Sequence, residues 1–552
     1  MTTPTNSVVP DSRGINIFTI DEYALDLFSL YLPSDLNAFL QPHFQRLGAL
    51  AGGTLSDLAN SADKNPPTLS VRSRSGVDES RVLKHPDYVT MERLAYSDFG
   101  LAAISHRPGV LGWHSAMPPA AKYALTYLFV QAEFGLCCPV SMTDSLARTL
   151  KKFGESKLVE SFLPMLTSLD FDELKQGAMF MTEQGAGSDV SATDVQASLQ
   201  GDGRWALSGD KWFCSNPDAG FAMVLARSES EETGLKGVSL FLLPRDLEDG
   251  SHNHYRILRL KDKLGTRSMA SGEIRLEGAK AWLIGERGQG FKLMTDMINN
   301  SRLSNGVRAA GLMRRATTEA MYVAQHRSAF GKHLIEFPLM QRQLLKMLVW
   351  TEQARTMVFQ TAKVLEAADA GDANAKKLTR IMTPLLKFRA CRDARKVTGD
   401  AMEVRGGCGY IEEWSDARLL RDAHLGSIWE GTSNIVALDV QRAIARDDCL
   451  PTLQAHVQGL LEGISGQEKS ISLIHKAFDF SMRTVEQPHL ARQAASSLYH
   501  AVTVAGLLWE AKAPRLSKRR MIAELVVEHR LAARDPFYDN SELQARCWSL
   551  LA

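Results

Sequence analysis

The sequence predicts a mainly helical protein with one β domain in the middle of the chain. Apolar side chains recur at helical spacing from about residue 20 to 180. Between about 181 and 285 they form short strand-like runs, such as 219–227 and 237–243, separated by Gly, Asp and Ser turns. The helical period returns after residue 290 and holds to about 447, and another helical stretch follows Pro451.

These changes divide the chain into four expected domains. They are an N-terminal helical domain over residues 1–180, a β domain over 181–285, a four-helix bundle over 286–447 and an extra helical domain over 448–552. In the first domain, residues 122–134 and 142–153 are predicted to be helices packed on one face. Loops at 326–338 and 405–409 separate the helices of the bundle.

The composition is that of a globular protein of mixed charge. Of 552 residues, 45% are hydrophobic and 23% charged, and 64 Lys and Arg balance 63 Asp and Glu, so any nucleic-acid or membrane binding must be local. Seven cysteines without a C-x-x-C pair predict neither a disulfide framework nor a zinc site. The polar N-terminus and the lack of about 18 uninterrupted apolar residues predict a cytoplasmic protein without a signal peptide or membrane span.

Glu430 is the candidate general base. It stands between Trp429 and Gly431 in the segment 421–434. The indole can shield the carboxylate from water and make it more basic, while the glycine lets the backbone approach a ligand closely. For a Glu followed by Gly-Thr-Ser, the structural alternative is a turn that starts a helix.

Two segments around the β domain suit a flat or anionic ligand. In 181–189, glycines let backbone N–H groups crowd around such a ligand, and Ser188 adds a hydroxyl donor. In 209–216, strand alternation puts Phe213 and Ser215 on one face, where they can cover and hydrogen-bond a planar ring. An ordinary turn and an ordinary buried strand are the alternatives.

Two segments of the bundle suit phosphate groups. Arg327 and Phe330 follow a helix and offer a guanidinium to a phosphate and a ring to a base. The glycines of 403–410 stand at a helix end, which suits close approach to a pyrophosphate. A helix-ending salt bridge with a core Phe, and a C-cap turn, are the alternatives.

Together and in this order, these segments resemble the acyl-CoA dehydrogenase family of flavoproteins. The resemblance covers roughly residues 85–447 and includes a Thr-Glu-x-x-x-Gly-Ser-Asp loop, a Lys-x-Phe-x-Ser strand, an Arg-x-x-Phe-Gly loop, a Gly-Gly-x-Gly turn and a Glu-Gly-Thr end. The long N-terminal segment, residues 261–265, Trp429 and the extra C-terminal domain are similar to the AidB branch, that of the alkylation-response flavoprotein. The resemblance implies an α-bundle, β-barrel, α-bundle fold, bound FAD and a homotetramer built as a dimer of dimers.

The resemblance also implies a flavin site. Phe213 would lie against the isoalloxazine, Ser215 would hydrogen-bond near N5, and Arg327 and Phe330 would reach FAD from a neighbouring subunit. The full set of implied cofactor-binding residues is Met181, Thr182, Gly187, Ser188, Phe213, Ser215, Arg327, Phe330, Gly406, Gly407, Thr432 and Asn434.

The implied reaction is the desaturation of an acyl-CoA or a related acyl thioester, with an electron acceptor to reoxidise the flavin. Glu430 would remove the proton α to the thioester while a hydride leaves the β carbon for flavin N5. Arg302 matches the family's arginine beside the base, although Ser301 replaces its acidic partner. Trp429 is bulkier than the Tyr common in the family and would narrow the substrate pocket.

A second hypothesis concerns the C-terminal domain. Five basic side chains fall within nine residues without an acid: Lys512, Arg515, Lys518, Arg519 and Arg520. Such a cluster can neutralise phosphates, and the AidB resemblance implies duplex DNA binding by this domain. A solvated helix face is the alternative for the cluster. The two hypotheses are therefore an FAD-dependent dehydrogenase and a flavin-bearing DNA-binding protein with secondary or no dehydrogenase activity.

Overall fold

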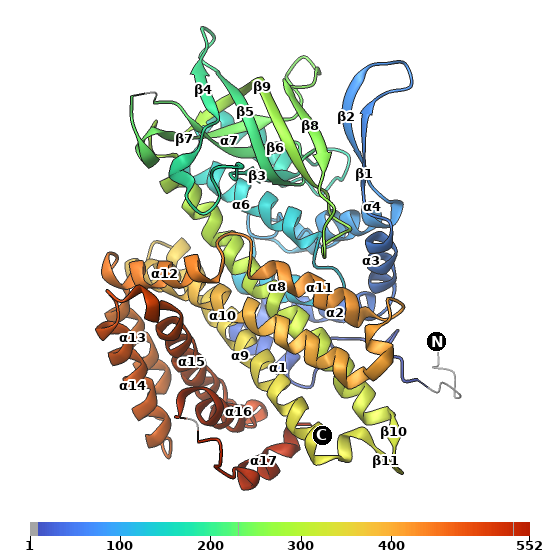
Figure 1. Ribbon diagram of the computed structural model, residues 1–552, viewed down its shortest axis with the longest axis vertical. Helices are drawn as coiled ribbons and strands as arrows, with labels where there is room; N and C mark the ends of the chain where they lie inside the picture. Colours follow the sequence, from blue (N-terminus) through green and yellow to red (C-terminus); the bar gives the residue numbers. More distant parts are fainter. Residues whose placement is uncertain (1–8, 230, 534, 552) are drawn as a thin grey trace. The chain divides into compact units, whose positions relative to one another are not determined.

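The computed structural model describes residues 9–229, 231–533 and 535–551, and the chain folds into two compact units (Figure 1). The β unit comprises residues 57–117 and 133–301, and the helical unit comprises 1–56, 118–132 and 302–552. The predicted succession of helical, β-rich and helical regions is confirmed. The four domain boundaries stay a prediction.

Seven strands of the β unit form one sheet that closes on itself. They are β3 (Gly177–Phe180), β4 (Gln196–Leu199), β5 (Trp205–Ser215), β6 (Phe221–Arg227), β7 (Val238–Pro244), β8 (Tyr255–Leu260) and β9 (Ser271–Ile284). The strand order is β3-β6-β4-β5-β9-β7, β8 pairs with β9, and β6 also pairs with β7. The pairing therefore runs in a ring, and apolar side chains such as Leu207, Val224 and Phe241 fill its interior.

The β unit also contains a hairpin that the sequence analysis missed. Residues around 68–83, expected to belong to a mostly helical region, form β1 (Thr68–Arg72) and β2 (Asp78–Leu83). The strands are short and largely exposed, so their two-residue alternation is weak. The helices of this unit are α3 (Thr54–Lys64) from residue 57 on, α4 (Pro86–Arg93), α6 (Cys137–Phe153), α7 (Ser156–Leu166) and the first part of α8 (Gly290–His326).

Long helices dominate the helical unit. Residues 302–326 of α8, α9 (Pro338–Asp369) and α10 (Ala373–Arg405) pack with shorter helices, which are α1 (Ala24–Tyr31), α2 (Ser34–Gly52), α5 (Pro119–Phe129), α11 (Ser415–Gly426) and α12 (Ser433–Ala445). Local signals fix the ends of the long helices: Pro338 starts α9, and the Asp372 side chain accepts a hydrogen bond from Ala375 N at 2.8 Å to start α10. A short hairpin, β10 (Ser328–Ala329) and β11 (Lys332–His333), joins α8 to α9.

The last hundred residues form five more helices of the same unit. They are α13 (Cys449–Leu461), α14 (Glu468–Arg483), α15 (Ala491–Glu510), α16 (Arg519–Val526) and α17 (Ser541–Cys547). Helix α15 packs on α9 so closely that a Cβ added at Gly506 would lie 2.6 Å from Thr356 Cγ2. The extra C-terminal helices are therefore packed into the bundle.

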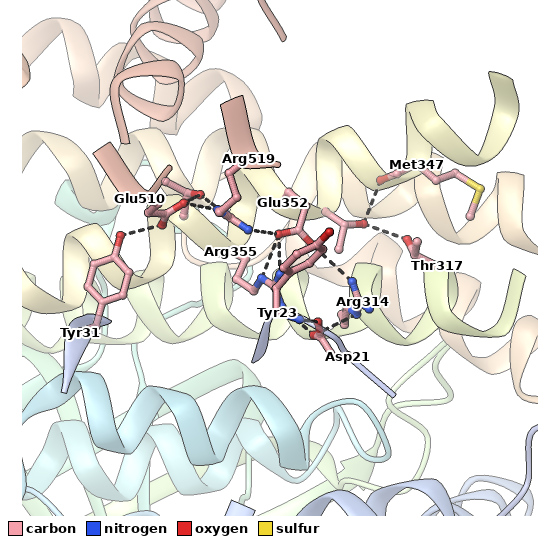
Figure 2. A network of polar contacts seen from close by, with 12 residues as sticks. Asp21, Tyr23, Tyr31, Arg314, Thr317, Met347, Glu352, Arg355, Glu510 and Arg519 are labelled. Carbon is pink, nitrogen blue, oxygen red and sulfur yellow. Dashed lines mark hydrogen bonds and ion pairs between the residues drawn. The ribbon is translucent and has the colours of Figure 1, made fainter. Parts of the chain in front are cut away.

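A buried polar network joins α16 to the long helices (Figure 2). Its centre is Glu352 on α9, which accepts hydrogen bonds from Arg355 Nη2 and Arg519 Nη1, both at 2.6 Å, and from Arg314 Nη1 at 3.3 Å. Burial alone raises the pKa of Glu352, but the three guanidinium groups lower it below its ordinary value. The carboxylate is therefore kept ionised inside the bundle.

The network continues to the N-terminal segment and to α15. Arg355 Nη1 donates to Asp21 Oδ2 at 2.6 Å, while Arg519 Nε donates to Glu510 Oε2 at 2.5 Å. Glu510 also accepts from the Tyr31 hydroxyl at 2.7 Å. Segments far apart in the sequence thus depend on one set of buried charges, and loss of one partner leaves another charge uncompensated.

Among the described residues, no helix has both the length and the apolarity to cross a bilayer.

Candidate active site

Glu430 lies in the turn between α11 and α12, with its backbone in the left-handed region at φ +54°. Its side chain is half-buried, and Asn305 Nδ2 of α8 donates to its Oε2 at 2.5 Å. Arg302 Nε donates to its backbone carbonyl at 3.1 Å. A non-glycine residue held in this conformation requires surrounding contacts that fix it, and α8 supplies two of them.

Arg302 and Lys387 secure the same turn. Arg302 Nη1 pairs with Asp439 Oδ2 of α12 at 2.7 Å, which compensates the acid that the sequence lacks at Ser301. Lys387 of α10 donates through Nζ to the carbonyl of Gly431, the residue after the base. Burial lowers the pKa of Lys387 to about 8, and the nearby Glu430 carboxylate opposes that shift.

Trp429 packs beside the base on the side of α8. The guanidinium carbon of buried Arg308 lies 4.7 Å from the centre of the indole ring, a cation–π distance. The indole is half-buried and is therefore a fixed wall next to Glu430. Its predicted place in a substrate pocket stays a prediction.

In the β unit, the loop 181–189 is held by a residue to which the sequence analysis gave no role. Glu183 accepts from Lys211 Nζ of β5 at 2.6 Å and from Asp194 N at 2.7 Å. Thr182 is half-buried, Ser188 is exposed, and a Cβ added at Gly187 would meet nothing within 4 Å. The buried Glu183–Lys211 pair therefore fixes a loop in which Ser188 and the glycines stay accessible while Ala186 is buried.

Strand β5 presents the predicted aromatic and hydroxyl on one side. Cys214 is fully buried, whereas Phe213 is 57% exposed and Ser215 is half-buried. Lys261 Nζ lies 4.8 Å from the Phe213 ring centre and 3.4 Å from that of Trp212. The alternative of an ordinary buried strand therefore does not hold for Phe213.

The predicted phosphate-binding residues of the helical unit lie close to one another. Arg327 Nη1 donates to the Arg405 carbonyl at 2.9 Å and lies 3.3 Å from a Cβ added at Gly406, which has φ +73°. Gly407 is exposed, and Phe330 is 97% exposed in the β10–β11 turn. The alternative of a core Phe is therefore wrong for this ring. Thr432 precedes α12, and both Thr432 and Asn434 are exposed.

The basic C-terminal cluster differs from the prediction. Arg519 is fully buried between Glu352 and Glu510, so it is not available to a phosphate. The other four members are mostly engaged within the chain: Lys512 donates to Glu462 O at 2.6 Å, Arg520 to Ser465 O at 2.5 Å, Arg515 pairs with Asp26 at 3.4 Å, and Lys518 lies 3.8 Å from Glu22. The cluster is therefore not one free basic face.

Sequence reasoning missed three residues that hold the base turn. Asn305, Lys387 and Asp439 belong to α8, α10 and α12, and none stands in a recognisable motif. A weak signal was present, since a buried Asn or Lys inside an apolar helical row needs a polar partner. The signal did not identify that partner.

Comparison with known proteins places this geometry in a family. The model of the AidB (adaptive response protein) N-terminal domain matches residues 7–173, that of the acyl-CoA dehydrogenase middle domain matches 178–279, and that of the acyl-CoA dehydrogenase C-terminal domain matches 288–445. The putative acyl-CoA dehydrogenase AidB of Escherichia coli is 32% identical over 480 residues, which cover 84% of this chain and 82% of that protein.

Two solved structures share the architecture. The structure of Caenorhabditis elegans ACDH-11 in complex with C11-CoA has a TM-score of 0.88 and 26% identity, covering 100% of this chain and 97% of that one. The structure described as Bd2924 apo-form has a TM-score of 0.83 and 30% identity, covering 92% of this chain and 100% of that one. The chain therefore belongs to the acyl-CoA dehydrogenase family, among its AidB-like members.

Proposed function

We propose that this protein is an FAD-dependent acyl-CoA dehydrogenase in which Glu430 removes the α proton of an acyl thioester. The observation that carries the proposal is the half-buried Glu430 carboxylate, in a strained turn to which three side chains donate hydrogen bonds. A base fixed in position reacts faster than a mobile one, because the ordering of the reacting groups precedes the reaction.

The residues present fit a flavin. Phe213 and Phe330 are large aromatic side chains that this chain leaves 57% and 97% exposed, although both stand in ordered turns or strands. Exposed rings of this kind suit a planar ligand or a partner surface. Phe213 and Ser215 would hold the ring system, and Met181, Thr182, Gly187 and Ser188 would hold the flavin edge and pyrophosphate. Arg327 and Phe330 of a neighbouring subunit would hold the pyrophosphate and adenine side, helped by Gly406 and Gly407, and Thr432 and Asn434 would close over FAD after the base.

In the proposed reaction the side chains around Glu430 have separate tasks. Glu430 accepts the α proton, and its backbone N–H polarises the thioester oxygen to make that proton more acidic. Before the proton is transferred, Asn305 stabilises the negative charge of the Glu430 carboxylate, because its amide donates a hydrogen bond to Oε2. Arg302 holds the carbonyl of Glu430, and Lys387 holds the carbonyl of the next residue, Gly431. FAD, when bound, supplies the acceptor for the β hydride.

We also propose that the substrate is an acyl-CoA or a related acyl thioester. The related ACDH-11 was solved in complex with C11-CoA, which supports this class. Trp429, fixed against Arg308, narrows the pocket and disfavours bulky groups next to the reacting carbons. The protein would work in the cytoplasm as a homotetramer and pass electrons to a separate acceptor.

A screen for flavin reduction tests the proposal. Purified protein reconstituted with FAD should be yellow, and at least one acyl-CoA of a panel graded by chain length and branching should bleach it in the absence of oxygen. Protein that cannot be reconstituted with FAD, or that no member of the panel reduces, would contradict the proposal. The Arg327→Ala variant should lose FAD and subunit association together, since the proposal places Arg327 across a subunit interface.

The main support for the alternative function, DNA binding, is the name of the relative AidB. The basic C-terminal cluster supports it little, because most of its side chains hydrogen-bond or pair with other groups of the chain.

A further inference from the structure

A basic pocket lies within the helical unit, on a different face of α10 from Lys387. Its volume is about 820 Å³. It lies among α9, α10 and the turn after α16, and its charged lining consists of Arg342, Lys346, Arg389, Arg392, Lys396 and Arg530 with Asp393, Asp400 and Glu403. Six cationic side chains therefore face three carboxylates.

The carboxylates leave part of this positive charge uncompensated. Asp393 pairs with Arg389 at 2.6 Å and Asp400 pairs with Lys396 at 2.6 Å, each within α10. Across the part of the chain that the structure describes, no carboxylate lies within ion-pair distance of Arg342, Lys346 or Arg392. The buried Nε of Arg392 also has no hydrogen-bond acceptor among these residues.

Burial and the resulting positive potential lower the pKa values of two neighbouring side chains, His529 and Arg392. The pKa of His529 is lowered by burial and then by Arg342, Lys346 and Arg530, against the opposing effect of Glu528. The pKa of Arg392 is lowered by burial and by Arg492, Arg389 and Arg395. Cations crowded in this way repel one another, and a bound anion would relieve the repulsion.

We propose that this pocket binds a small organic polyphosphate. The pocket is in the size range of small-molecule sites and is too small to admit a nucleic-acid duplex. Arg342, Arg392 and Lys346, which have no carboxylate partner among the described residues, suit phosphate oxygens, which take paired hydrogen bonds from guanidinium groups. Leu339, Val349 and Trp350 add an apolar wall for the organic body of the ligand, so a nucleotide fits better than an inorganic anion.

Isothermal titration of the FAD-loaded protein with ATP, inorganic tripolyphosphate and a short DNA duplex tests the proposal. ATP should bind, its affinity should fall as salt is raised, and tripolyphosphate should bind more weakly. The triple variant Arg342→Gln, Lys346→Gln, Arg392→Gln should weaken ATP binding by roughly 30-fold or more. A control with the same loss of charge at exposed lysines outside the pocket, Lys151→Gln, Lys157→Gln, Lys376→Gln, should bind like wild type.

A second readout does not depend on affinity alone. In histidine-labelled protein, ATP should raise the measured pKa of His529, because the anion offsets the field of Arg342, Lys346 and Arg530. His43, whose pKa is lowered by burial and by Arg46 outside the pocket, should not respond. The proposal would be overturned if the protein bound DNA tightly but not ATP, or if the control variant weakened ATP binding as much as the triple variant. It would also be overturned if the pKa of His529 did not change on ATP binding, or if the triple variant changed only subunit assembly.

Discussion

The Arg519→Met variant should destabilise the protein strongly, although Arg519 stands in a run of basic residues that looks like surface. Arg519 donates to Glu352 at 2.6 Å, to Glu510 at 2.5 Å and to Thr356 Oγ1 at 2.7 Å, and it is fully buried. Its loss leaves Glu352 with two other guanidinium partners, Arg355 and Arg314. Among the described residues, Glu510 then keeps only two uncharged donors, the hydroxyls of Tyr31 and Thr356.

Breaking a buried pair in this way costs about 3–5 kcal/mol. For the helical unit, with an unfolding entropy of about 2.1 cal/mol/K per residue, that corresponds to a fall in Tm of roughly 4–7 °C, measured by scanning calorimetry. Arg520→Met is the matched control, because the Arg520 side chain is exposed and, among the described residues, donates only to Ser465 O. A change within about 0.5 kcal/mol is therefore expected. Adding Glu510→Gln to Arg519→Met should restore part of the loss. Equal stability of the Arg519→Met and Arg520→Met variants would refute the buried network.

Three further predictions concern the proposed active site. Leucine is close to asparagine in size but lacks the amide that donates to Glu430, so Asn305→Leu should lower kcat about tenfold or more and leave KM and FAD content nearly unchanged. An equal effect on KM would instead indicate that the substitution disturbs the structure of the site. Lys387 has a pKa of about 8 in place of 10.5, so the folded protein releases a proton that the unfolded chain keeps, and stability should rise by about 3 kcal/mol from pH 8 to 10.5. Urea unfolding of Lys387→Met should lack that part of the rise. Phe213→Ala should raise the Kd for FAD about tenfold, whereas Val71→Ala, at an equally exposed apolar position of the β unit, should not.

Local patterns were enough to predict the β domain and the accessible side of its strand β5. Alternation around Cys214 correctly placed Phe213 and Ser215 together on the accessible side of their strand. Residues 406 and 431 are glycines with positive φ, as close turns require. Glu430 itself adopts positive φ without being a glycine, which no local rule predicts.

Contacts between distant segments could not be predicted in the same way. Arg519 shares a helical row with Ile522, Ala523 and Val526, all buried, yet its basic neighbours favoured a solvated face. The row was visible in the sequence, but the two carboxylates that make burial possible come from α9 and α15. Asn305 and Lys387 likewise depend on the placing of whole helices around one turn. The spacing of apolar residues in one sequence predicts which helix faces are buried. It does not predict which charged side chains pair between the packed helices.

The rate of flavin reduction by an acyl-CoA in the Glu430→Gln variant tests the proposed function most directly. The glutamine keeps the shape of the side chain and its contact with Asn305, but it cannot accept the α proton. With the acyl-CoA that reduces wild-type protein fastest, stopped-flow absorbance at the flavin band should show reduction slowed by about a thousandfold or more, with unchanged FAD content. Reduction at the wild-type rate would show that another group removes the proton and would contradict the assignment of Glu430 as the base.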